Sequence, residues 1–216
     1  STAAVIFWQW ANQSFNALVN YTNRNAKSTV TPGVITFSYC TATSAALITA
    51  LGLKKFLAKR GGSLVQRLVP LAAVYAAQCV NVPLMRQNEL KHGLSLIDEK
   101  DVERGKSKLA AVKAIGLVVF SRNVIATPSM LFTPILMEYF EKQHWFRKNR
   151  SYLNTLFQVF FSALFLLPMV PIGCALFPQK NTIKTCTLEK YEPTAFAGLR
   201  MSAASMPGKL YFNKGL

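Results

Sequence analysis

The sequence predicts an all-α fold, a multi-span transmembrane helical bundle. Of its 216 residues, 51% belong to the hydrophobic set and only 16% are charged. A soluble domain of this length normally carries about a quarter charged residues. The charged residues also gather in short blocks between long uncharged stretches. Long apolar stretches separated by charged connectors are typical of a chain that crosses a bilayer several times.

Four stretches are apolar enough to cross a bilayer, which takes about 20 residues. We expect helices, because each backbone polar group in lipid needs an internal hydrogen-bond partner. The first stretch is rich in small and hydroxyl residues, which predicts an interior helix. The spans cover about 34–53, 68–85, 109–137 and 156–177, within a bundle predicted over 1–177 and followed by an extramembrane tail over 178–216.

Prolines interrupt the last three spans. A proline inside a helix removes one backbone hydrogen bond and crowds the preceding turn, so each is expected to break its helix. The expected breaks are Pro83, Pro128, Pro134, Pro168 and Pro171. The connector over 86–108 mixes both charges and is expected to be a solvated loop. The tail loses hydrophobicity and contains several prolines and glycines, which predicts partly irregular structure.

The net charge of +16 does not indicate nucleic-acid binding here. The basic residues lie in short connectors, where Lys and Arg set the orientation of spans and attract anionic lipid headgroups. The four cysteines form no CxxC spacing, and the two histidines are isolated. The sequence therefore predicts no metal site, no disulfide framework and no cofactor.

Catalytic patterns are absent from the sequence. No predicted span contains Asp or Glu, and neither a GxSxG motif nor a glycine-rich phosphate loop occurs. We therefore do not expect an enzyme. The lack of carboxylates in the spans also weakens a proton relay.

An amide stripe marks the first segment. At helical spacing, one face carries Gln9, Asn12, Gln13, Asn16 and Asn20. Amides offer donors and acceptors without net charge, which suits a polar zwitterion that crosses a membrane. The same stripe could instead join helices together or face water at the edge of the bilayer, because amide bonds between helices are common in membrane bundles. Both interpretations stay open.

Two further motifs place polar groups in predicted spans. Asn81 precedes Pro83, so its amide could bond the freed backbone or a ligand, while Arg86 could extend to the headgroups. Arg122 and Asn123 lie in the middle of the third span. A charge in the middle of a span costs at least about 2.5 kcal/mol, so Arg122 should face the bundle interior or a water-filled cavity. There its planar guanidinium could bind both oxygens of a carboxylate. An interfacial position near the headgroups is the alternative.

Several long motifs resemble the sideroflexin family. They are Phe7-Trp8-Gln9-Trp10-Ala11-Asn12-Gln13-Ser14-Phe15-Asn16-Ala17, Val19-Asn20-Tyr21-Thr22-Asn23-Arg24, Asn81-Val82-Pro83-Leu84-Met85-Arg86-Gln87, Ser121-Arg122, Phe177-Pro178-Gln179-Lys180 and Tyr211-Phe212-Asn213-Lys214-Gly215-Leu216. The resemblance implies a multi-pass protein of the mitochondrial inner membrane with about five spans. It implies transport of serine into the matrix for one-carbon metabolism, while other members are linked to iron handling, haem or respiratory-complex assembly.

The resemblance also predicts what the chain lacks. The family's amino-terminal part, with a His-Pro-Asp-Thr motif and the first span, is not found, so the chain should correspond to the carboxy-terminal two-thirds. The tail between Pro193 and Lys209 looks unlike the usual family sequence. We therefore expect a transporter of serine or a similar amino acid that works by alternating access. The alternative is a scaffold that assembles inner-membrane protein partners.

Overall fold

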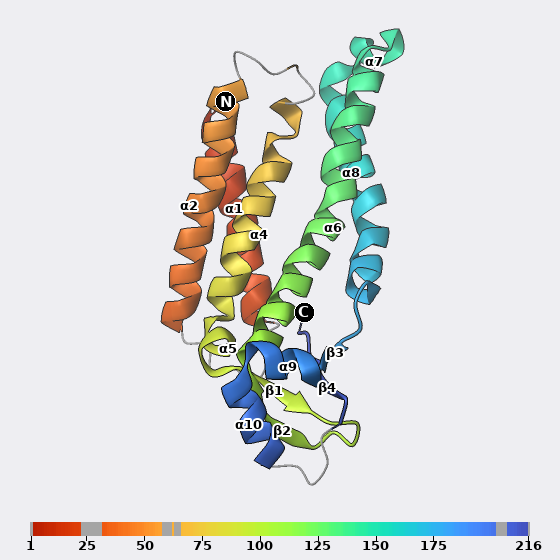
Figure 1. Cartoon of the computed structure of the whole chain (residues 1–216). Helices are drawn as coiled ribbons and strands as arrows, with labels where there is room; N and C mark the ends of the chain where they lie inside the picture. The colour runs from red at the N-terminus through yellow and green to blue at the C-terminus, as the bar shows by residue number, and fades with distance from the viewer. Residues whose placement is uncertain (1, 23–31, 58–61, 63–65, 202–206, 216) are drawn as a thin grey trace.

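Long helices lie side by side and end on a small sheet layer (Figure 1). The computed structural model describes residues 2–22, 32–57, 62, 66–201 and 207–215. The long helices are α1 (Thr2–Thr22), α2 (Pro32–Leu57), α4 (Val69–Met85), α6 (Lys108–Glu141) and α8 (Arg150–Ala175). Three of them have segments long and apolar enough to cross a membrane, while α4 is apolar but shorter. The predicted class, a mainly helical multi-span bundle, is confirmed.

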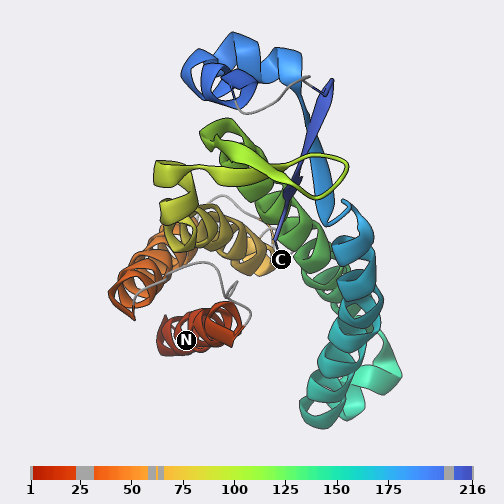
Figure 2. The ribbon, with the colours of Figure 1, turned by 90° about the horizontal axis from the view of Figure 1, so that it is seen from below.

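Helix α2 lies at the edge of the bundle rather than in its interior (Figure 2). Ala42, Ala46 and Ala50 are buried and recur every four residues, so they share one face of the helix. That face packs against α4, whose Ala73 and Ala77 are also buried. The small residues therefore permit close approach on one side only, and the expectation of an interior helix is wrong.

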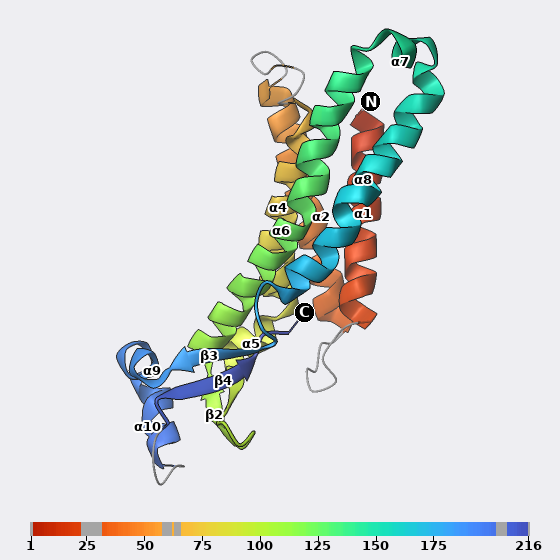
Figure 3. The same ribbon diagram turned by 90° about the vertical axis from the view of Figure 1, so that its right-hand side faces the viewer.

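Helices α6 and α8 form the second close pair, joined by the short helix α7 (His144–Lys148) (Figure 3). A Cβ built on Gly173 of α8 would lie 2.1 Å from Cγ1 of Ile125 on α6. Only a residue without a side chain fits at such a distance. Gly173 therefore lets the Ile125 side chain of α6 pack directly against the backbone of α8.

The expected helix breaks are not seen, because the helices continue through all five prolines. Pro83 lies inside α4, Pro128 and Pro134 inside α6, and Pro168 and Pro171 inside α8. Membrane helices tolerate proline where hydroxyl side chains and neighbouring helices satisfy the freed backbone groups. Next to Pro128, the hydroxyl of Thr127 donates to the carbonyl of Asn123 at 2.6 Å.

The connector and the tail fold together into a four-stranded antiparallel sheet, which corrects the expectation of a loop and a partly irregular tail. The connector supplies the first half and the tail the second, in the strand order β2-β1-β4-β3. These elements are α5 (Gln87–His92), β1 (Leu94–Ile97), β2 (Glu103–Ser107), β3 (Lys180–Lys184), α9 (Thr185–Tyr191), α10 (Pro193–Met201) and β4 (Lys209–Asn213). Apolar residues that alternate along the strands explain the pairing. Leu96, Leu210 and Phe212 are buried with Leu188 of α9 against the first turns of α6.

A carboxylate from the tail caps the amino-terminal end of α6. The hydroxyl of Ser107, the N-cap residue, accepts from the backbone N–H of Ala110 at 3.1 Å. Glu192 accepts from the Ser107 hydroxyl at 2.5 Å and from the backbone N–H of Lys108 at 2.8 Å. The first N–H groups of a helix lack partners within the helix and attract negative charge. The tail thus fixes the end of the longest helix.

Replacing this capping carboxylate should destabilise the protein. Glu192→Ala is expected to lower Tm by about 2–4 °C, the shift that the loss of a helix cap of about 1 kcal/mol produces in a chain of this size. Thermal unfolding of the detergent-solubilised protein measures the change. Glu189→Ala, an exposed carboxylate on the same short helix, should leave Tm unchanged. Equal effects of the two substitutions would contradict the capping role.

Asp98 organises the turn between β1 and β2. Its carboxylate accepts from the guanidinium of Arg104 at 2.6 and 2.9 Å, and from the backbone N–H groups of Lys100 and Val102 at 2.8 and 3.1 Å. The hydrogen bonds from Arg104, opposed by burial and helped by the two N–H groups, lower the pKa of Asp98 below its usual 3.8. The charged form is therefore the one that the fold stabilises.

The contribution of Asp98 to stability should depend on pH. Because its pKa is lower in the folded state, the contribution is fully present above 3.8 and is lost as the pH falls through the folded value. Asp98→Asn should therefore lower Tm at pH 7 and have no effect once the pH is below the folded pKa of Asp98. Thermal unfolding across this range checks it, with Glu99→Gln as the matched variant. A Tm difference between Asp98→Asn and the parent that does not change with pH would contradict a stabilising role of the charged Asp98 carboxylate.

Candidate functional site

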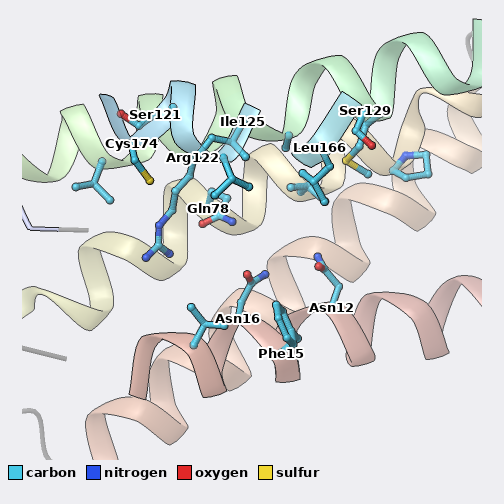
Figure 4. Close-up of a pocket in the computed structure, with 18 of the residues that line it drawn as sticks. Asn12, Phe15, Asn16, Gln78, Ser121, Arg122, Ile125, Ser129, Leu166 and Cys174 are labelled. Atoms are coloured by element: carbon cyan, nitrogen blue, oxygen red, sulfur yellow. The ribbon is translucent and has the colours of Figure 1, made fainter. Parts of the chain in front are cut away.

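A cavity of about 680 Å³ lies between α1, α4, α6 and α8 (Figure 4). Its walls are mostly apolar, with a small set of polar side chains, which is the usual make-up of a small-molecule site. The polar residues come from all four helices and from the end of the tail. They are Gln9, Asn12, Asn16, Gln78, Ser121, Arg122, Ser129, Cys174 and Lys214.

The amide stripe of α1 supplies one wall of the cavity. Asn12 and Asn16 extend from α1 toward the facing helices (Figure 4), and Gln9 is only 7% exposed. Phe7 and Trp10, on other faces of the same helix, are exposed. The separation of amides from aromatics is partial, because the aromatic residues Trp8 and Phe15 line the cavity beside the amides.

Three residues predicted for the substrate path, Gln13, Asn81 and Asn123, do not line this cavity. Gln13 and Asn81 are buried at 2% and 4% exposure in the helix packing, and Asn123 is half-buried beside Arg122. Asn20 belongs to α1, but its side chain lies outside the described residues. Whether any of the four meets a substrate stays a prediction.

The structure adds residues that sequence reasoning passed over. Gln78 and Ser121 line the cavity from α4 and α6, and Lys214 lines it from the segment after β4. A glutamine in an uncharged span was a usable signal for Gln78, because an amide is expensive to expose to lipid. Nothing in the sequence around Lys214 indicates that the tail returns to the bundle.

One end of the cavity is cationic. The guanidinium of Arg122 extends from α6 into the space between the helices (Figure 4), and Lys214 lines the same cavity. The ammonium of Lys214 donates to the carbonyl of Phe177 at 3.0 Å. Among the described lining residues there is no Asp or Glu. This end therefore favours a ligand that carries a negative charge.

Arg86 holds this end in place instead of extending to the headgroups. It donates to the carbonyl of Lys214 at 2.7 Å and pairs with Glu89 at 2.5 Å. Its guanidinium also lies 3.3 Å from where a Cβ on Gly215 would stand, at a backbone φ of +77°. Glycine adopts this left-handed conformation without strain. Arg86 and Gly215 together allow the tail to reach the cavity.

Several residues that line the cavity carry a buried polar atom that has no hydrogen-bond partner among the described residues. These atoms are Oε1 of Gln9, Oε1 of Gln78 and Oγ of Ser121, from α1, α4 and α6. Buried polar atoms are nearly always paired, and an unpaired one costs about 1–3 kcal/mol. Two carbonyl oxygens and a hydroxyl near a cationic end form a set that can bind a ligand with an ammonium, a carboxylate and a hydroxyl group.

Sequence similarity identifies the family. The family model described as Sideroflexins matches residues 1–216, the whole chain. The chain belongs to the sideroflexin family. The family assigned from the motifs is confirmed, and together with the apolar helices it makes the chain a multi-pass membrane protein.

Named relatives give the same result. The chain is 45% identical over 214 residues to "Sideroflexin-2" of Drosophila melanogaster and 46% identical over 213 residues to "Sideroflexin-2" of Homo sapiens, covering 99% of this chain in both cases. It is 43% identical over 216 residues to "Sideroflexin-1" of Mus musculus. This sideroflexin spans 65% of the length of each of these curated relatives. No solved structure matches the chain.

A native cysteine reports on whether water fills the cavity. Cys40, Cys79 and Cys174 are all exposed, but only Cys174 of the three lines the cavity, while Cys40 and Cys79 lie on α2 and α4 outside it. A methanethiosulfonate reagent reacts with the thiolate, which forms less readily in apolar surroundings than in water. In liposomes, a charged reagent should therefore modify Cys174 at least about tenfold faster than Cys40 or Cys79. Mass spectrometry of the modified peptides measures the rates. Equal rates at the three sites would show that the cavity is closed to water.

Proposed function

We propose that this sideroflexin is a transporter of a small neutral amino acid, with serine the expected substrate, in the mitochondrial inner membrane. The observation that carries the proposal is the cavity with Arg122 at one end and unpaired amide oxygens beside it. A neutral amino acid carries one negative and one positive group, and the cavity offers partners for both. Transport of serine into the matrix would feed one-carbon metabolism, as the family resemblance implies.

Each group of serine has a partner in the cavity. Its carboxylate would bind the guanidinium of Arg122, whose fork matches the two oxygens. Its ammonium would donate to the unpaired amide oxygens of Gln9 and Gln78, and its hydroxyl would meet Ser121. The cavity volume of about 680 Å³ exceeds that of serine, so ordered water would accompany the substrate.

Alternating access needs elements that move without exposing backbone groups to lipid. Pro128 and Pro134 in α6, and Pro168 and Pro171 in α8, leave gaps in the hydrogen-bond ladder of continuous helices. These gaps are places where α6 and α8 can bend as a pair. The absence of Asp and Glu among the described cavity residues favours carriage without proton coupling.

Serine uptake into liposomes that contain the purified protein tests the proposal. Arg122→Gln should reduce uptake by at least about tenfold, because it removes a charge-assisted, bidentate contact worth roughly 1.5–3 kcal/mol. Arg147→Gln, an exposed cation in α7, should leave uptake unchanged. A version extended with the amino-terminal part of a relative should be measured beside this chain.

The possible results separate the two candidate functions. Uptake that depends on Arg122 in either version supports a carrier. If neither version moves serine after correct insertion, the substrate assignment fails, and a scaffold for inner-membrane partners takes its place. A scaffold should lose partners when the exposed sheet layer is altered and keep them in Arg122→Gln.

A further inference from the structure

A second cavity of about 530 Å³ continues the first toward the α7 end of the bundle. The two cavities share three lining residues, Pro70, Ser129 and Met130, so they meet along α4 and α6. Unlike the first cavity, the second contains both charges, Arg67 and Glu141. The two cavities together therefore line the bundle from the sheet end to the opposite end.

The joined space, called the lane below, runs along much of α6. Arg122 and Glu141 lie 19 positions apart on this helix. At 1.5 Å per residue, this separation is about 28 Å along the axis. The charged groups of the two cavities thus stand far apart along the lane.

An ion pair occupies the second cavity. Arg67 bonds Glu141 through two contacts, 2.7 Å between Nη2 and Oε2 and 3.4 Å between Nη1 and Oε1. The side chains of Arg67 and Glu141 are 32% and 16% exposed. Arg150 stands 3.7 Å from the same carboxylate but is 66% exposed. Separating the inner pair without replacement would leave Arg67 without Glu141, and Glu141 with only the more distant and exposed Arg150, which is costly.

The wall between the pair and the first cavity is also polar. Thr133 lines the second cavity, and its buried hydroxyl has no partner among the described residues. The hydroxyl of Ser129, in the shared wall, donates to the carbonyl of Ser162 at 3.2 Å. A zwitterion that leaves Arg122 therefore meets hydroxyl groups before it meets the ion pair.

We propose that the second cavity is a second binding site for a zwitterionic amino acid, whose own charges replace the Arg67–Glu141 ion pair. The proposal rests on the transport function proposed above. The carboxylate of the substrate takes the guanidinium of Arg67, and its ammonium takes the carboxylate of Glu141. Every charge stays paired through the exchange. Without substrate, Arg67 and Glu141 neutralise each other at this end of the lane.

Accessibility of a cysteine at Thr133 tests the site without relying on transport. In a variant whose four native cysteines are replaced by alanine, Thr133→Cys should react slowly with a charged methanethiosulfonate reagent applied to liposomes. Adding Arg67→Gln should accelerate the reaction roughly fivefold, as expected from the loss of one half-buried ion pair. Arg67→Lys, which can keep a single contact, should give a smaller increase. Arg150→Gln should match the parent.

Protection by the ligand completes the test. Serine should slow the modification of Thr133→Cys when Arg67 and Glu141 are intact, and should not do so in Arg67→Gln. If Arg67→Gln reacts at the parental rate, or if serine gives no protection, the second site is overturned. Ser162→Cys, on the same cavity, serves as reporter if Thr133→Cys does not fold. Serine uptake by the parent protein is measured in parallel with the modification rates. Uptake without protection overturns the second site alone, whereas loss of both overturns the transport function as well.

Discussion

A guanidinium in the middle of a long apolar helix is the constraint on which the rest of this structure depends. Arg122 lies well inside α6, which is apolar and long enough to cross a bilayer. Exposure of that charge to lipid costs at least about 2.5 kcal/mol, so one side of α6 must face a polar space. The opposite wall of that space is α1, whose amides tolerate neither lipid nor dry packing without partners. Arg122 and the amide stripe thus require each other, and the cavity between them follows.

The sheet layer fixes the geometry of this cavity from one end. Glu192 caps α6, and the pair of Arg86 with Glu89 extends to the carbonyl of Lys214. These contacts tie the tail to the two helices that carry Gln78 and Arg122. The opposite end carries the Arg67–Glu141 pair, with Arg150 3.7 Å from the same carboxylate. The two ends are therefore held by different contacts, an asymmetry that fits the proposed alternating access.

The sequence was sufficient for the parts governed by local patterns. The mainly helical class and the apolar character of the long helices follow from composition and helical period. The sheet was missed because β1 pairs with β4, with Ile97 opposite Tyr211, and such distant pairing leaves no local signal. Asn81 and Asn123 were predicted for the path because their polarity was visible, but the packing of neighbouring helices decides which face meets the cavity. The prolines were expected to break helices that tertiary packing keeps continuous.

The most direct measurement of the central claim is a structure of the protein in lipid nanodiscs with serine present. We expect density for one serine between α1, α4 and α6, with its carboxylate on Arg122 and its ammonium near the amide oxygens of Gln9 and Gln78. Serine bound outside this cavity, or a cavity filled by the side chains of α1 and α6 in the presence of saturating serine, would contradict it.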